Sequence, residues 1–250
     1  MEKKWKKLSN PPVVTAIFQI LFEDDKLKLE DFLSCDTRLR RDLPNKSENL
    51  ESSLSLSPAT RIPLGKAKVS GEANTRRVGY VYFTTDQKDK LSLSEHDITY
   101  TTESDYLGWD SFKNFVLKIL GELSDVLRNA KIKRTSIRFI NQFKIENFDD
   151  PTEYFNTQIV SSIDEAMQYP LLKYGFRLTF DVSEGIYSIV NQNADRMTDK
   201  YVYIFDIDVL DNNNMMFDVK SIDEKMENLR NIKNTIFFAN LTQKTLKLCD

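Results

Sequence analysis

The sequence predicts an α+β protein in which long helices cover one face of a large, mostly antiparallel sheet. Several segments alternate apolar and polar residues with the period of a strand, and short polar turns separate some of them. Two long segments instead carry the apolar spacing of an amphipathic helix. Short connections favour antiparallel pairing, and the apolar side of each helix needs a sheet face to cover.

The first expected strand spans residues 13–22, directly after a Pro-Pro pair, and it is rich in β-branched and aromatic residues. Its polar exceptions, Thr15 and Gln19, share one face. Residues 23–77 are poor in aromatic residues and Ser-rich in their second half. We expect them to form a long, partly mobile insertion with one or two short helices.

The rest of the chain alternates between strands and helices. In the first half we expect strands at 78–85 and 91–102, and a helix from Asp110 or Ser111 to about Asn129. In the second half we expect a strand at 132–145, a helix opened by Asp150-Pro151 and ended before Pro170, strands at 174–182, 185–192 and 201–210, and a helix at 218–248 with a Ser221-x-x-Glu224 capping box.

This order predicts one domain over residues 1–250 with a structural pseudo-repeat. Each half, 1–129 and 130–250, places its strands before a long helix. A tight hairpin is expected at Ser183-Glu184-Gly185, between two of the strands of the second half.

The composition disfavours several classes of function. The net charge of -3 offers no overall basic field for nucleic acid, and no window approaches a membrane span. His96 is the single histidine, so a two-histidine metal site is excluded, and the seven glycines form no phosphate-binding loop. We therefore expect no cofactor. Cys35 and Cys249 are expected to be free thiols in a reducing cytoplasm.

Five phrases of the sequence occur together in a familiar order. They are SNPPVVTAIFQILF (9–22), YLGWDSF (106–112), SIRFINQF (136–143), YIFDIDVL (203–210) and LRNIKNTIFFANLTQKTLKL (229–248). The chain in this respect resembles an uncharacterised, sporadically distributed bacterial family of about 250-residue proteins. The resemblance covers the chain except 23–77 and implies a bacterial cytoplasmic protein without a settled activity. The family's patchy distribution resembles that of genes in mobile or anti-phage defence islands.

Two aspartates form the first candidate site. Asp206 and Asp208 lie two residues apart on an expected strand, so their side chains point to the same face. Carboxylates at this spacing could share a divalent cation, with Asp181 or Glu184 as a third acid. The alternative is an exposed sheet face without a metal.

Basic and polar residues form the second candidate site. The candidates for binding are Arg134, Arg138, Asn141, Gln142 and Arg177, to which Lys144 adds a charge. Such a surface could hold a phosphate, a carboxylate or the acidic segment of a partner. The alternative is an ion pair between Arg138 and Asp206 or Asp208 across the sheet.

Two aromatic residues have similar alternatives. Trp5 stands within a run of lysines that could touch an anionic surface or form a solvated terminus. Trp109 could pack the start of a helix onto the core or stack on a base, and we favour packing.

These observations favour a non-enzymatic interaction protein that acts through a protein partner, as an accessory subunit of a bacterial defence or mobile-element system. The polar sheet face, the sheet edges and residues 23–77 are the expected partner surfaces. One alternative is a metal-dependent enzyme that acts on nucleotide or nucleic acid through Asp206 and Asp208. Another is a sensor of a small ligand on the same face. A homodimer is also open.

Overall fold

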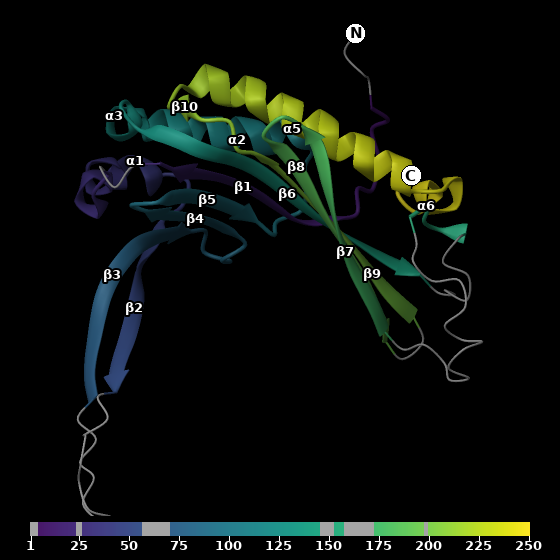
Figure 1. Ribbon diagram of the computed structural model, residues 1–250, viewed down its shortest axis with the longest axis horizontal. Coiled ribbons are helices and arrows are strands. Elements are labelled where there is room, and N and C mark those ends of the chain that lie inside the picture. Colours follow the sequence, from purple (N-terminus) through teal and green to yellow (C-terminus); the bar gives the residue numbers. More distant parts are fainter. Residues whose placement is uncertain (1–4, 24–26, 57–70, 146–152, 158–172, 198–199) are drawn as a thin grey trace, which may run out of the picture.

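A computed structural model describes residues 5–23, 27–56, 71–145, 153–157, 173–197 and 200–250. Some predictions fall on other residues: of the helix expected to open at Asp150-Pro151 and end before Pro170, only residues 153–157 are described. The described residues form an α+β fold with one large sheet, as the sequence predicts (Figure 1).

All strand pairs of the sheet are antiparallel. The order across the sheet is β2-β3-β4-β5-β1-β6-β9-β8-β7, and the short β10 pairs with the end of β6. The strands are β1 (Val13–Phe22), β2 (Asn45–Leu56), β3 (Gly71–Phe83), β4 (Asp89–Ser94), β5 (Asp97–Thr102), β6 (Lys131–Ile145), β7 (Lys173–Ser183), β8 (Ile186–Met197), β9 (Lys200–Asp211) and β10 (Met215–Met216).

The strand order repeats the same path in each half of the chain. The first strand of each half, β1 or β6, lies at the centre, and these two strands pair with each other. The following strands begin at an outer edge and return to the centre, at β5 and β9 respectively. A long helix then follows in both halves, so the topology has the expected pseudo-repeat.

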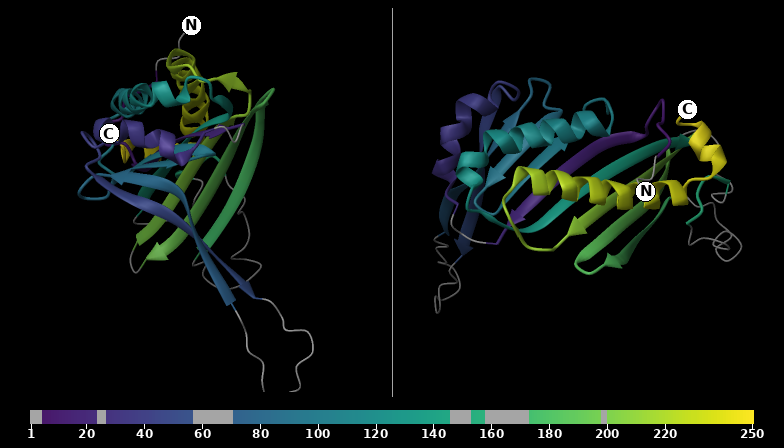
Figure 2. Two further views of the ribbon diagram at one scale, coloured as in Figure 1. Left: turned by 90° about the vertical axis from the view of Figure 1, so that its left-hand side faces the viewer. Right: turned by 90° about the horizontal axis from the view of Figure 1, so that it is seen from above.

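The helices lie on one face of the sheet, which arches beneath them (Figures 1 and 2). They are η1 (Leu29–Cys35), α1 (Asp36–Leu39), α2 (Trp109–Glu122), α3 (Ser124–Leu127), α5 (Val219–Asn240) and α6 (Gln243–Lys247). We call the opposite, concave face the open face; it carries Arg138 on β6 and Asp206 on β9. Among the described residues, no helix packs on the open face.

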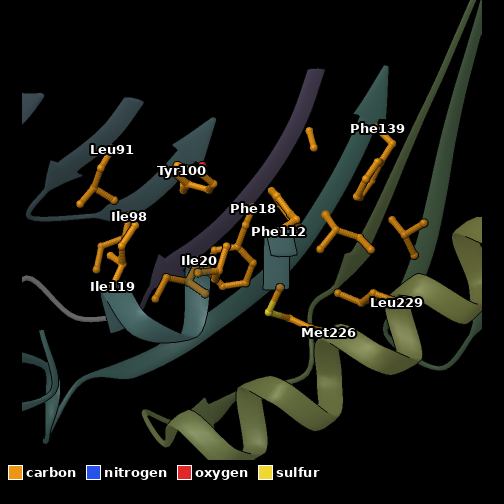
Figure 3. Close-up of a cluster of buried hydrophobic side chains, with 14 of the residues drawn as sticks. Phe18, Ile20, Leu91, Ile98, Tyr100, Phe112, Ile119, Phe139, Met226 and Leu229 are labelled. Atoms are coloured by element: carbon orange, nitrogen blue, oxygen red, sulfur yellow. The ribbon is translucent and has the colours of Figure 1, made fainter. Parts of the chain in front are cut away.

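The core lies between the sheet and the two long helices. Phe112 and Ile119 of α2 pack with Phe18 of β1, whereas Met226 and Leu229 of α5 pack over strands from the second half of the chain (Figure 3). All five side chains are buried. This follows from the sequence pattern, because the alternate residues of the central strands and the apolar stripes of the helices are the ones that meet.

The described parts of residues 23–77 are more regular than predicted. The expected short helices are present as η1 and α1, but residues 45–56 and 71–83 form the long antiparallel hairpin β2–β3. The Ser-rich segment pairs through its backbone at the edge of the sheet and extends beyond the helices (Figure 1). Its strand therefore needs no apolar face, which is why its composition indicates a loop.

Other boundaries also differ from the prediction. Residues 91–102 form two strands, β4 and β5, and His96 lies in the turn between them. The helix expected to reach Asn129 ends at Glu122, and the last helix breaks after Asn240. There Leu241 is extended and bridges Phe155.

The N-terminal cap of the last long helix also differs from the prediction. Asp218 caps α5, since its side chain accepts a hydrogen bond from the backbone of Ser221, in place of the predicted capping box.

The hairpin at Ser183-Glu184-Gly185 is present, and Gly185 has the positive φ that the turn requires.

Candidate functional site

The polar cluster on the open face arises from the register of four strands. Arg138 of β6 lies opposite Asp208 of β9, and Asn191 of β8 lies opposite Asp206. Arg177 of β7 in turn lies opposite Asn191. Residues directly opposite each other in neighbouring strands point to the same face, so this register gathers the side chains on the open face.

The strongest contact in the cluster joins Arg138 and Asp206. Arg138 Nε donates to Asp206 Oδ1 at 2.8 Å, and its Nη2 donates to Oδ2 at 2.7 Å. Asn191 Nδ2 also donates to Oδ2, at 2.9 Å. The Asp206 side chain is 6% exposed and that of Arg138 41% exposed. This bidentate pair is the cross-strand ion pair that the sequence offers as an alternative to a binding site.

Asp208 is the unsatisfied member of the cluster. Its Oδ1 is buried and has no hydrogen-bond partner among the described residues. Burial raises the pKa of Asp208 to about 6, and the charge of Asp206 adds to this effect. The positive charges of Arg138, Arg134 and Arg177 oppose it. Asp208 therefore retains an acceptor that this part of the chain does not use.

Arg134 connects the cluster to the first half of the sheet. Its Nη2 donates to Gln19 Oε1 at 2.7 Å, and Gln19 Nε2 donates to Thr99 Oγ1 at 3.0 Å and Asp97 Oδ2 at 3.2 Å. The Nε of Arg134 is buried and lacks a hydrogen-bond partner within the described residues. Gln19 thus lies on the same face as Arg134.

Two further predicted residues, Gln142 and Arg177, also lie on the open face. Arg177 is exposed and Gln142 is half-buried. Neither side chain makes a hydrogen bond or ion pair within the part of the chain that the structure describes. Within the described residues, Arg177 therefore presents a guanidinium without a hydrogen-bonded partner at the rim of the cluster.

Asn141 does not belong to this cluster. It lies on the helix-covered side, is 2% exposed, and donates from Nδ2 to the backbone oxygens of Phe205, at 2.9 Å, and Phe139, at 3.3 Å. Grouping it with Arg138 on one surface was wrong, because residues three apart on a strand point to opposite faces.

The geometry weakens the metal hypothesis. Asp206 and Asp208 share a face as predicted, but the guanidinium of Arg138 contacts both oxygens of Asp206. Across the described ranges there is no group of three His, Cys, Asp or Glu side chains that could hold a metal ion.

The sequence analysis did not single out Asn191, although this residue donates the third hydrogen bond to the carboxylate of Asp206. Asn191 lies at an alternate position of the strand expected at 185–192. This position becomes informative only once that strand is known to pair with the strand that carries Asp206 and Asp208. Trp109 is 6% exposed, which agrees with its predicted role in packing. Cys35 and Cys249 are free and buried.

The fold and the cluster define an α+β protein whose helices fill one face of an arched sheet and leave an arginine-containing polar face open. No protein-family model matches the chain, and no curated protein matches it. No helix in the described ranges is long and apolar enough to cross a membrane.

Proposed function

We propose that this protein is a non-enzymatic interaction module that binds an acidic segment of a protein partner on its open face. The observation that carries the proposal is the arginine cluster, where Arg177 makes no hydrogen bond or ion pair with the described residues and the side chain of Arg138 is 41% exposed. A carboxylate of the partner would accept from Arg177 and from the solvent-accessible part of the Arg138 guanidinium.

The charge of the open face favours a protein over a nucleic acid. Arg134, Arg138 and Arg177 are interspersed with Asp206 and Asp208. A nucleic-acid surface needs a basic stripe that neutralises successive phosphates, and two carboxylates within the cluster would repel that backbone. A mixed arrangement suits a partner that carries both acidic groups and donors.

The same geometry disfavours the enzyme alternative. A metal on Asp206 would have to displace the two hydrogen bonds from Arg138. In the proposed function, that carboxylate holds the guanidinium of Arg138 in position for recognition. From the family resemblance of the sequence, we propose that the partner belongs to a defence or mobile-element system in a bacterial cytoplasm.

Site-specific photocrosslinking tests the proposal. Tyr187 lies on the open face and is 38% exposed, whereas Leu33 of η1 lies on the helix-covered side and is 43% exposed. We expect benzoylphenylalanine at position 187, but not at position 33, to crosslink to one protein in a lysate of the source organism. Arg177→Glu should reduce this crosslink at least tenfold, because it would face the partner's carboxylates.

Arg196→Glu is the matched control, since Arg196 is exposed on β8 but points away from the open face. It should leave the crosslink unchanged. Equal losses for both variants, crosslinks from both positions, a crosslink to nucleic acid or a crosslink between two copies of this chain would each contradict the proposal.

A further inference from the structure

A cavity of about 400 Å³ lies on the helix-covered side of the sheet, away from the open face. It is bounded by the N-terminal segment 5–13, by residues 106–110 at the start of α2 and directly before it, and by the part of α5 from Arg230 to Phe238. This volume lies within the range of small-molecule sites. Because it lies on the opposite side of the sheet, the cavity is separate from the arginine cluster and from the function proposed for that cluster.

The N-terminal segment is fixed in place beside the C-terminal half of α5 (Figure 1). The ring of Trp5 stacks on Phe238 with 5.4 Å between centroids and 5° between planes, and Trp5 Nε1 donates to Asn231 Oδ1 at 3.1 Å. Further along, the backbone oxygen of Pro12 accepts from the backbone N–H of Gln142. These contacts give the cavity a preformed wall.

Lys233 stands where the pattern of α5 calls for an apolar residue. The buried stripe of this helix contains Met226, Leu229 and Phe237, and Lys233 continues the same spacing. Its ammonium lies 4.4 Å from the centroid of the Phe139 ring. Within the described residues it has no carboxylate partner and makes no hydrogen bond. A cation in such surroundings carries a desolvation cost that only the aromatic rings offset.

The carboxylate of Glu227, on the same helix, is already committed to other groups. It accepts from Trp109 Nε1 at 2.7 Å and from Arg230 at 3.2 Å, and it pairs with Lys113 at 2.8 Å. The nearby charge of Arg230 adds to the effect of burial, and together they lower the pKa of Lys233 to about 7. No carboxylate of the described residues pairs with Lys233.

The other walls of the cavity combine aromatic rings with polar side chains, and they include the carboxylate of Asp110 and the cations of Lys6, Lys7 and Arg230. Tyr106, Trp109 and Phe237 contribute aromatic rings. Asn234 is 7% exposed, lines the cavity, and makes no side-chain hydrogen bond within the described part of the chain. An amide N–H beside an ammonium is a donor pair that suits a carboxylate.

We infer that the cavity binds a small carboxylate with a planar apolar body, with Lys233 as the anion receptor, Asn234 as a second donor and the aromatic rings as the walls. A monoanion fits better than a phosphate for two reasons. Among the other cations that line the cavity, Lys6 pairs with Asp250, Arg230 pairs with Glu227, and Lys7 is exposed to solvent. The carboxylate of Asp110, which also lines the cavity, would repel a second negative charge. The carboxylate of the ligand would supply the ion-pair partner that Lys233 lacks among the described residues.

Titration calorimetry with 2-naphthoate tests this inference, and 2-naphthamide serves as its uncharged counterpart. We expect saturable one-to-one binding of 2-naphthoate to the full chain. Lys233→Met, which keeps the length of the side chain and removes its charge, should weaken 2-naphthoate about tenfold or more and leave the affinity for 2-naphthamide nearly unchanged. Lys220→Met, at an exposed position of the same helix, should change neither affinity.

The folded state of each variant is checked by thermal unfolding. Lys233→Met should unfold at a higher temperature than the parent, so a loss of binding would not be the result of unfolding. Equal affinities of 2-naphthoate for the parent and Lys233→Met would overturn the inference, as would the absence of saturable binding. A parallel loss with Lys220→Met would show binding of the probe to general positive charge only.

Discussion

Arg138 and Asp206 form a bidentate ion pair across β6 and β9, with hydrogen bonds of 2.8 and 2.7 Å, and the two partners differ in burial. The carboxylate is 6% exposed, whereas the arginine side chain is 41% exposed. Because of this difference, the aspartate depends on the arginine much more than the arginine depends on the aspartate. The pair fixes the centre of the open face.

Removal of the two partners should therefore have unequal effects on stability. Arg138→Met leaves a buried carboxylate with only Asn191 as a donor, and we expect a loss of about 2 kcal/mol in the free energy of unfolding. Asp206→Asn leaves an arginine that can reach water, and we expect a loss of about 1 kcal/mol. Urea unfolding of both variants and of the double variant measures the coupling. Additive losses would show that the pair contributes no net interaction.

Asp208 should make stability depend on pH. Its folded pKa of about 6 lies above the unfolded value near 3.8, so the folded state binds the proton more tightly. The contribution of this group to stability is thus fully present below pH 3.8 and is lost as the pH rises through 6. Asp208→Asn should remove this dependence and stabilise the protein at pH 7 by no more than about 2 kcal/mol, given the partial exposure of the residue.

Urea unfolding of the parent and Asp208→Asn at pH 5 and pH 7 measures this contribution. The difference in stability between the two proteins should be larger at pH 7 than at pH 5. A difference that stays the same at both values would show that Asp208 titrates normally in the folded protein.

The sequence predicts the fold class well where side-chain periodicity is strong. The alternation around Phe139 and the stripe through Met226 identify β6 and α5 because burial imposes those periods. The hairpin β2–β3 was missed because its pairing is mainly a matter of backbone hydrogen bonds at a sheet edge. Local composition carries little information about such pairing.

The candidate site was predictable only in part for a related reason. The alternation of side chains along each strand predicts the face on which Arg138 and Asp206 lie. Their ion pair requires in addition that β6 and β9 be neighbours in the sheet. The cavity around Lys233 joins the N-terminal segment to the last helix, which no local pattern connects. Its one local signal is a lysine within the apolar stripe of α5.

Lys233 should make stability depend on pH in the direction opposite to Asp208. Its folded pKa of about 7 lies below the ordinary value of 10.5, so the unfolded state binds the proton more tightly. The free energy of unfolding should rise between pH 7 and pH 10, by on the order of 2 kcal/mol for a half-buried lysine. Lys233→Met should lack this rise, whereas Lys220→Met should retain it. Urea unfolding at pH 7, 8.5 and 10 provides the comparison, and an identical rise in all three proteins would assign it to other groups.

Two glycines should respond oppositely to replacement by alanine. Gly185 has a φ of +75°, and an added Cβ would lie 2.6 Å from Oδ1 of Asn213. Gly185→Ala should therefore cost about 1–2 kcal/mol, through backbone strain and displacement of that side chain. Gly121 lies inside α2, where an added Cβ meets no atom within 4 Å. Gly121→Ala should stabilise the protein by about 0.5–1 kcal/mol, because alanine loses less conformational entropy in a helix. Thermal and urea unfolding of the two variants check both signs. Stabilisation by Gly185→Ala would show that the turn between β7 and β8 adopts another conformation.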